Sequence, residues 1–140
     1  KIKEITPVET TINSDIARLN KAVNNVTKTD YDFTNYDTII IDFWATWCPS
    51  CRLQNQHFNN FLKTTNKALI LGVCVDKDPN ALTKFLKTNP YQFPVFNNNK
   101  EIAELFDDIT VVPTHYIINM KNQTIKKQLG VITLDELKRI

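Results

Sequence analysis

Two cysteines separated by Pro49 and Ser50 have the residue types and the spacing for redox chemistry. They follow a run of β-prone residues, 38–44, and a helix that begins at Pro49 would carry Cys48 at its amino end. Unpaired backbone N–H groups and the positive end of the helix dipole favour the thiolate of Cys48 at that position. Cys51 lies one turn later, where its sulfur can attack a mixed disulfide at Cys48. The spacing therefore predicts a nucleophilic thiol and a resolving thiol.

A structural staple and half of a metal site are the alternative interpretations of this pair. A bridge across so short a loop removes little entropy from the unfolded chain, so it stabilises a fold only weakly. A structural zinc site requires four ligands, and the chain has neither a second Cys-x-x-Cys nor two histidines at zinc-finger spacing. The context favours the redox pair, and we expect neither a metal nor a cofactor.

Two apolar strands with a helix between them are expected to position the cysteines. Residues 38–44, TIIIDFW, and residues 68–75, ALILGVCV, are nearly continuous apolar runs, as in strands of a parallel sheet that is covered on both faces. The intervening helix begins at Pro49, and the connection should be right-handed. Its expected buried stripe consists of Leu53, Phe58, Phe61 and Leu62.

Further elements are expected before and after this unit. An amphipathic helix is predicted over residues 11–24, and an antiparallel hairpin over residues 113–120 and 124–130. The apolar stripe of the first helix consists of Ile12, Ile16, Leu19 and Val23. Shorter pieces are a helix at 78–87, an extended segment at 93–96 and a helix at 100–106. The last helix should open with a capping box from Thr133 to Glu136 and turn Leu134, Leu137 and Ile140 inward.

The chain as a whole has the length and composition of one soluble globular domain. Its 140 residues can bury a real core, and no apolar run is long enough to cross a membrane. The formal net charge is only +2 and the lysines are scattered among acids, which argues against a nucleic-acid or membrane surface. The chain starts at Lys1 without a charged-then-apolar leader, which indicates a processed or trimmed form.

The segment IIIDFWATWCPSC, together with VVPTHYIIN, resembles the thioredoxin superfamily, and the likeness runs in order through residues 38–140. The segment around 78–106 is similar to the insertion of the TlpA-like thiol-disulfide oxidoreductases. The resemblance implies an α/β thioredoxin fold, with a central mixed sheet flanked by helices. We expect one domain, 1–140, in which residues 1–37 form an extension with an extra helix.

The resemblance also implies a substrate groove around the cysteines. Pro113 would be a cis proline that faces them, and the backbone of Val112 would offer hydrogen bonds to a bound partner. From the residues alone, a proline at the first position of a strand with an ordinary trans bond is the default. The groove would be completed by Trp47, Pro49 and Ser50, which lie in or beside the motif.

Asp42 is an acid inside an otherwise apolar strand. Burial raises the pKa of such a carboxyl toward the range that is useful for proton transfer. In the family, an acid at this place helps to deprotonate the resolving cysteine, so the resemblance implies that Asp42 manages the proton of Cys51. The alternative is a strand-end acid that backbone donors satisfy. Gly72 stands where thioredoxin has a lysine near this acid, which removes a partner that would hold Asp42 charged.

The third cysteine and the histidines offer weaker candidates. Cys74 lies inside the second buried strand and is expected to be an inert core residue rather than a third redox or palmitoylated thiol. His115 follows Pro113 by two residues, so a Cys-Cys-His copper site is conceivable, as in Sco-like proteins, which use a wider cysteine spacing. A hydrogen-bonded or exposed histidine is the simpler interpretation of His115.

The expected function is thiol-disulfide exchange on protein cysteines. The resemblance implies an enzyme outside the cytoplasm, periplasmic or tethered through a removed N-terminal segment, that reduces disulfides for cytochrome c maturation or disulfide repair. Its partners would be protein substrates and an upstream thiol-disulfide redox protein. The alternatives are a disulfide-forming oxidase or isomerase on the same fold, and a copper-binding chaperone.

Overall fold

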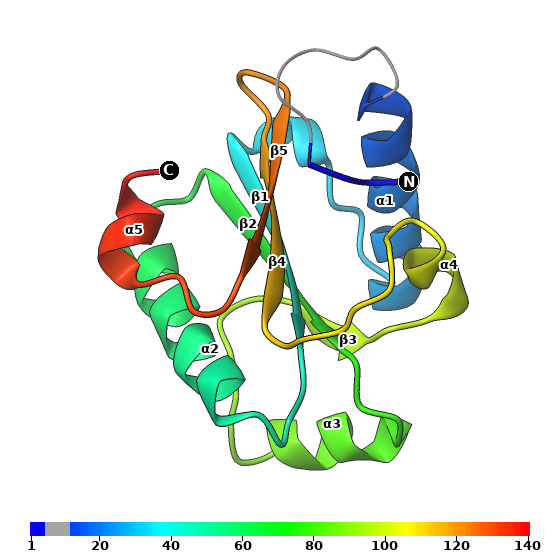
Figure 1. Cartoon of the computed structure of the whole chain (residues 1–140), viewed down its shortest axis with the longest axis vertical. Helices are drawn as coiled ribbons and strands as arrows, with labels where there is room; N and C mark the ends of the chain where they lie inside the picture. Colours follow the sequence, from blue (N-terminus) through cyan, green and yellow to red (C-terminus); the bar gives the residue numbers. More distant parts are fainter. Residues whose placement is uncertain (5–11) are drawn as a thin grey trace.

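The computed structural model describes residues 1–4 and 12–140, and side chains from residue 14 onward in the first helix. Its centre is a five-stranded mixed sheet in the order β3-β2-β1-β4-β5, in which β1, β2 and β3 are parallel and β4 runs antiparallel to β1 (Figure 1). The elements are α1 (Ile12–Thr27), the 3-10 helix η1 (Phe33–Asn35), β1 (Thr38–Trp44), α2 (Pro49–Leu62), β2 (Ala68–Cys74), α3 (Pro79–Leu86), β3 (Val95–Asn97), α4 (Lys100–Ala103), β4 (Thr114–Asn119), β5 (Thr124–Leu129) and α5 (Leu134–Lys138).

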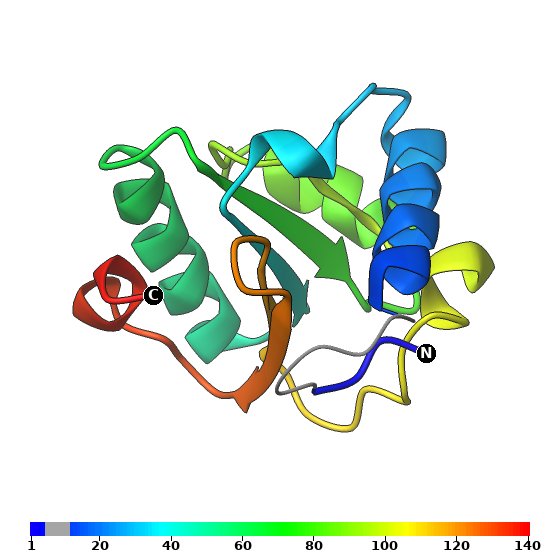
Figure 2. The same ribbon diagram turned by 90° about the horizontal axis from the view of Figure 1, so that it is seen from above.

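The sheet is covered by helices on both faces, as Figure 2 shows from above: α2 and α5 lie on one face, and α1 and α4 on the other. Successive residues of β1 point alternately to the two faces of the sheet. Ile39, Ile41 and Phe43 belong to the core under α1 and α4, whereas Ile40 packs with the residues of α2 and α5. The expected α/β thioredoxin fold, with a mixed sheet and flanking helices, is confirmed.

Helix α2 begins where the sequence predicts, because Cys48 caps it and Pro49 occupies its first turn. Of the expected buried stripe, Phe58 and Phe61 are buried and Leu62 packs partly buried against the same core, but the expectation for Leu53 is wrong. Leu53 is 48% exposed, and the side chains that face the sheet are Cys51, Gln54, Asn55, Phe58 and Phe61. These positions follow the i, i+3, i+4, i+7 rule from Cys51, which fixes the phase of the helix and turns Leu53 outward.

The other elements agree with expectation apart from their ends. In α1, Ile16, Leu19 and Val23 are buried as predicted, while residue 11 and the side chain of Ile12 lie outside the described residues. The hairpin of β4 and β5 and the capping box of α5 are confirmed. The helix predicted at 100–106 ends at Ala103. The inward placement of Ile140 is wrong, because α5 ends at Lys138 and Ile140 is 45% exposed.

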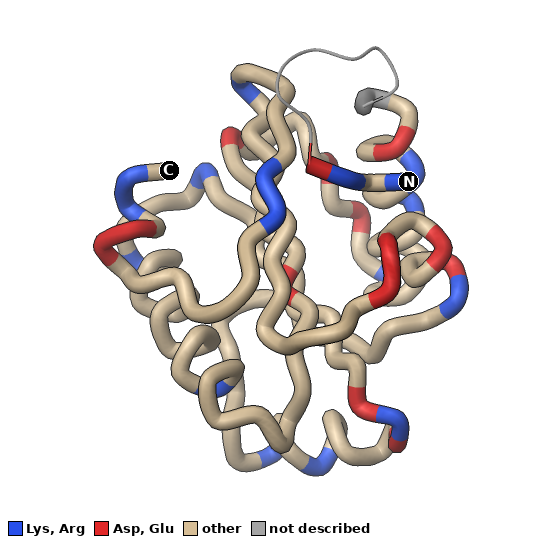
Figure 3. Tube along the Cα trace, in the orientation of Figure 1, with Lys and Arg blue, Asp and Glu red and all other residues tan. Residues whose placement is uncertain are grey.

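Charged positions of both signs alternate along the chain, and Figure 3 shows no broad face of one sign among the residues it colours. Within the described part of the chain, no helix combines the length and the apolar character that crossing a bilayer requires. The charge pattern therefore gives no indication of a nucleic-acid surface.

Candidate active site

Cys48 and Cys51 are joined by a disulfide at the amino end of α2, with their Cα atoms 5.2 Å apart. The backbone N–H of Cys51 donates to Sγ of Cys48 at 3.2 Å, so the sulfur occupies the position of a helix-capping acceptor. In the reduced protein, the same N–H and the helix dipole stabilise a Cys48 thiolate. Cys48 is 4% exposed and Cys51 is fully buried, which makes Cys48 the sulfur nearer to solvent.

Exposed residues in and beside the Cys-Pro-Ser-Cys segment surround the sulfur of Cys48. The side chain of Trp47 is 68% exposed, and Pro49 and Ser50 also face solvent. The hydroxyl of Ser50 lies 3.3 Å from Sγ of Cys48, within reach of a hydrogen bond to the sulfur. An exposed aromatic ring and a hydroxyl therefore border the reactive sulfur.

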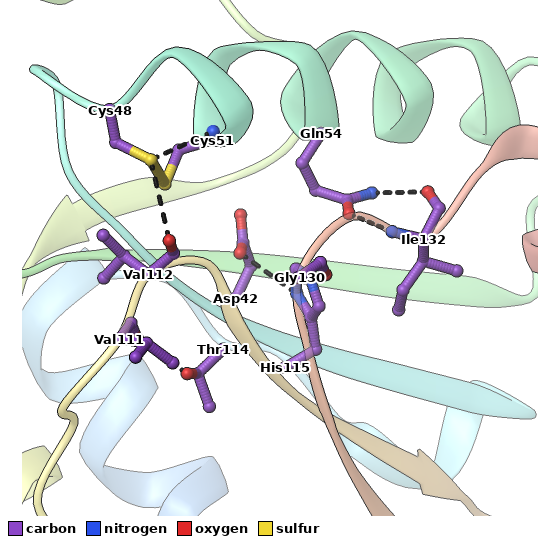
Figure 4. A network of polar contacts seen from close by, with 10 residues as sticks. All are labelled: Asp42, Cys48, Cys51, Gln54, Val111, Val112, Thr114, His115, Gly130 and Ile132. Atoms are coloured by element: carbon purple, nitrogen blue, oxygen red, sulfur yellow. Dashed lines mark hydrogen bonds and ion pairs between the residues drawn. A yellow bond between two sulfur atoms is a disulfide. The ribbon is translucent and has the colours of Figure 1, made fainter.

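The loop before β4 faces the disulfide from the other side (Figure 4). The Val112–Pro113 peptide bond is cis, and the carbonyl oxygen of Val112 lies 3.8 Å from Sγ of Cys48. The hydroxyl of Thr114 donates to the carbonyl of Val111 at 2.7 Å, and the N–H of Gly130 donates to the carbonyl of Pro113 at 3.0 Å. These bonds hold the loop against the cysteines.

An acidic residue after β2 fixes the turn that leads into the motif. The Thr46 N–H donates to Oδ1 of Asp76 at 3.0 Å, and the hydroxyl of Thr46 donates to Oδ2. Arg52 on α2 donates to the carbonyl of Thr46 at 3.0 Å. Asp76 could not be singled out from the sequence, because only the pairing of β1 with β2 brings it to the turn. Arg52 is local to the turn, six residues after Thr46, but its contact depends on the course of α2.

Asp42 is fully buried, on the face of β1 that α2 covers (Figure 4). Its Oδ1 lies 3.1 Å from Nδ1 of His115, a distance for an ion pair or a shared proton, although the angle falls short of a well-aligned hydrogen bond. Its Oδ2 has no hydrogen-bond partner among the described residues. Burial raises the pKa of Asp42, and the hydrogen bond and charge of His115 act in the opposite direction.

His115 is the functional candidate whose role the sequence analysis missed. It is directly opposite Asp42 in the β1–β4 ladder and fully buried. Its Nε2 lies 3.0 Å from the carbonyl oxygen of Gly130, and the Phe58 ring packs edge-on against it at 5.7 Å between centroids. A histidine on the same strand face as Ile117 was the available signal, but its use requires the register of two strands that are far apart in sequence.

Gly72 is the neighbour of Asp42 in β2, and aromatic side chains fill the space beside it. A Cβ atom at Gly72 would lie 3.2 Å from Phe93 Cε2 and 3.2 Å from Trp44 Nε1. A long cationic side chain has no room at Gly72 in this packing. The partner of Asp42 comes from β4 instead.

Cys74 lies in a small core with Trp44 and Leu82 and is 1% exposed. Burial raises the pKa of its thiol to about 12, so the thiol stays protonated at neutral pH. A protonated, enclosed thiol is a poor nucleophile, which favours the interpretation of Cys74 as a core residue. Among the described residues, no three or more His, Cys, Asp or Glu side chains gather as a metal site would require.

The sheet order, the Cys48–Cys51 disulfide at the start of α2 and the facing cis proline together define a thioredoxin-fold dithiol site. The chain matches the model of the AhpC/TSA family over residues 10–128 and belongs to that family. Two relatives come from Bacillus subtilis. Sporulation thiol-disulfide oxidoreductase A is 28% identical over 105 residues, and thiol-disulfide oxidoreductase ResA is 26% identical over 98 residues.

A third relative, thiol:disulfide interchange protein DsbE of Haemophilus influenzae, is 34% identical over 105 residues. These matches include 71%, 68% and 74% of this chain but only 63%, 54% and 56% of the three relatives. The chain therefore matches between one half and two thirds of the length of each.

Solved structures agree in fold. The crystal structure of StoA from Bacillus subtilis superposes with a TM-score of 0.62 at 26% identity, covering 75% of this chain and 83% of that one. A thioredoxin family protein from Chlorobium tepidum gives 0.66 at 24% identity, covering 76% and 78%, and supports the fold alone. The resemblance to the TlpA-like branch of the thioredoxin superfamily is confirmed.

Proposed function

We propose that this chain is a protein thiol-disulfide oxidoreductase that works as a reductase. The observation that carries the exchange activity is the position of the disulfide: Cys48 caps α2, borders solvent and faces the carbonyl of Val112, while Cys51 is enclosed one turn later. A partner protein can reach the sulfur of Cys48, whereas the enclosed sulfur of Cys51 can react only with Cys48. This asymmetry suits attack by Cys48 and resolution by Cys51. The TlpA-like resemblance supports the reductive direction.

Reduction of a substrate disulfide would proceed in two exchanges. The Cys48 thiolate attacks one substrate sulfur, the substrate S–S bond breaks, and the other substrate sulfur leaves as a thiolate. Cys51 then loses its proton and attacks Sγ of Cys48, which releases the second substrate thiolate and forms the Cys48–Cys51 disulfide. Two electrons pass from the cysteine pair to the substrate, and a dithiol partner protein must return them.

The surface around Cys48 suits a protein substrate. Trp47, Pro49 and Ser50 form an exposed border on one side of the sulfur, and the half-buried Val112 and the buried Pro113 lie on the other side. The backbone of Val112 is placed to hydrogen-bond with an extended segment that carries the substrate cysteine. Two cavities, of about 290 and 400 Å³, lie away from the cysteine pair, at the amino end of β1 and between β5 and α5.

Asp42 is assigned the proton of Cys51 in this scheme. Its carboxyl is buried on the α2 side of the sheet, where the resolving thiol is also enclosed. The pair of sulfurs stores the two electrons itself, so no cofactor is required. The TlpA-like resemblance favours a site of action outside the cytoplasm, in a single domain with an N-terminal extension, and a redox partner protein upstream.

Two alternatives use the same residues differently. A disulfide-forming oxidase or isomerase would run the exchange in the opposite direction, and the geometry of the sulfurs serves both directions. A copper-binding chaperone would need His115 as a ligand. Both ring nitrogens of His115 already face partners, Asp42 and the carbonyl of Gly130, which disfavours copper ligation by this residue.

The proposal is tested by the reduction of insulin by dithiothreitol, followed as turbidity. The chain should accelerate precipitation, and Cys48→Ser should abolish the acceleration because the attacking sulfur is lost. Cys74→Ser is the matched control, since Cys74 is a free, buried cysteine that packs behind the pair and takes no part in the exchange, so the variant should retain the activity. Failure of the unaltered chain to accelerate the reaction, together with tight Cu(I) binding that His115→Ala abolishes, would favour the chaperone instead.

A further inference from the structure

The hydrogen bond of His115 to Gly130 determines which ring nitrogen carries its proton. A carbonyl oxygen can only accept, so Nε2, at 3.0 Å from the Gly130 oxygen, carries a hydrogen. In a neutral imidazole, Nδ1 is then a bare acceptor. This bare nitrogen is the atom that faces Oδ1 of Asp42 at 3.1 Å.

Two bare acceptors at that distance repel each other, so the pair must hold one further proton, on Oδ1 of Asp42 or on Nδ1 of His115. It belongs either to a carboxylic acid beside a neutral imidazole or to an imidazolium beside a carboxylate. Both forms carry no net charge, which suits two side chains that are fully buried. The surrounding apolar groups, among them the ring of Phe58, favour this neutral sum.

We propose that Asp42 and His115 share one proton and that this pair, rather than the carboxyl alone, takes the proton of Cys51 when a mixed disulfide is resolved. The inference deepens the proposed function and rests on it. Its reason is chemical: a buried carboxylic acid that already holds a proton is not a base. His115 gives that proton a place to go, and so makes the other oxygen of Asp42 an acceptor.

The positions of the two carboxyl oxygens fit such a relay. Oδ1 contacts His115, whereas Oδ2 has no partner among the described residues and is directed toward α2 on the side of Cys51 (Figure 4). The S–H proton of Cys51 passes to Oδ2 as the Oδ1 proton passes to Nδ1. The products are a Cys51 thiolate and a buried imidazolium of opposite charge. After the Cys48–Cys51 bond forms, the extra proton returns to the departing substrate thiolate or to water.

Few other titratable groups face the pair. Cys51 lies on α2, on the side of the sheet to which Asp42 points (Figure 4). Cys74 lies one strand away on β2, and Tyr91 comes from the loop before β3. Burial raises the pKa of both the Cys74 thiol and the Tyr91 hydroxyl, so both are protonated near neutral pH. Arg52 on α2 is the cation that acts on Tyr91.

Stopped-flow reaction of the reduced protein with dithiobis-nitrobenzoate separates the two sulfurs. Cys48 releases the first coloured thiolate and Cys51 the second, so the second phase reports resolution without any physiological substrate. We expect His115→Gln to slow the second phase by about 100-fold at neutral pH and to leave the first phase unchanged. Because Cys51 must then lose its proton to hydroxide, the deficit should shrink about tenfold for each pH unit toward alkaline pH. His57→Gln replaces the other histidine of the chain and should alter neither phase.

If His115 had only a structural role, His115→Gln would lower the rate of the second phase by the same factor at every pH. That result, or an unchanged rate, would overturn the proposal. Asp42→Asn should give the same profile, and the double variant should lose nothing further, because the two residues act as one unit. If His115→Gln does not fold, nitrogen NMR of the unaltered protein decides: Nε2 of His115 should carry a proton, and a bare Nε2 would overturn the inference. An inactive protein in the insulin assay that still shows this NMR signature would reject the proposed function alone.

Discussion

The two faces of the central sheet carry different kinds of side chain. The face under α1 and α4 is closed by apolar side chains such as Ile39, Ile41 and Phe43. The face under α2 also encloses Asp42 and His115 within an apolar surround. The residues named on both faces are buried, so the difference lies in their chemistry and not in their exposure.

This contrast shows how one strand serves stability and function together. Successive residues of β1 point to opposite sides, so Ile41 can contribute packing while its neighbour Asp42 contributes a proton site. Buried polar groups cost stability unless they are paired, and Asp42 with His115 is such a pair. The apolar face therefore supplies stability that the α2 face partly gives up.

The largest expected effect comes from a substitution that weakens the apolar face alone. Ile41→Ala should lower the free energy of unfolding by about 3 kcal/mol, because the side chain is fully buried and its loss leaves a cavity. Urea unfolding measures this loss. Insulin reduction per folded molecule should stay unchanged, and a large fall in it would mean that the two faces are not separable.

A smaller effect is expected from crowding the α2 face. Gly72→Ala places a Cβ atom 3.2 Å from Trp44 and Phe93, two buried rings with little freedom to move. We expect a loss of about 1–2 kcal/mol in the free energy of unfolding. Thermal unfolding checks it, and a more stable variant would show that the aromatic packing yields.

The smallest expected change in stability, and the one of opposite sign, comes from Asp42→Asn. Burial raises the pKa of Asp42, so the folded protein retains a proton that the unfolded chain has released above about pH 4. The stability tied to this proton is present at lower pH and declines as the pH rises toward the folded pKa. At neutral pH the variant should be slightly more stable than the unaltered protein, because the asparagine amide brings no ionisable group into the buried site.

Urea unfolding of Asp42→Asn and the unaltered protein between about pH 4 and pH 8 tests this sign. The advantage of the variant should grow with pH. An advantage that grows as the pH falls would show that Asp42 is held charged in the folded state.

Local sequence patterns predict much of the fold and the position of the cysteine pair at the start of α2. The apolar runs of β1 and β2 and the cap at Cys48 are properties of neighbouring residues, so the sequence revealed them. On α2 the expected burial of Phe58 and Phe61 is confirmed, but Leu53 is apolar yet exposed and Gln54 is polar yet buried. Gln54 is satisfied by two hydrogen bonds with the backbone of Ile132, at 2.9 and 2.5 Å, which no local pattern reveals.

The pairing of Asp42 with His115 depends on long-range register. The absence of a lysine at Gly72 indicated that Asp42 lacked the usual partner, but not that β4 would provide another. Residues 42 and 115 meet only because β4 lies antiparallel beside β1 in one specific alignment. A buried acid without an evident partner is thus a reason to search the neighbouring strands for one.

The equilibrium reduction potential of the Cys48–Cys51 pair, measured in glutathione or dithiothreitol buffers, tests the proposed role as a reductase most directly. We predict a value of about −250 mV or lower, at which the dithiol is a reductant of strained or exposed protein disulfides at equilibrium. A value of about −150 mV or higher would contradict this role and would indicate an oxidant or isomerase built on the same fold.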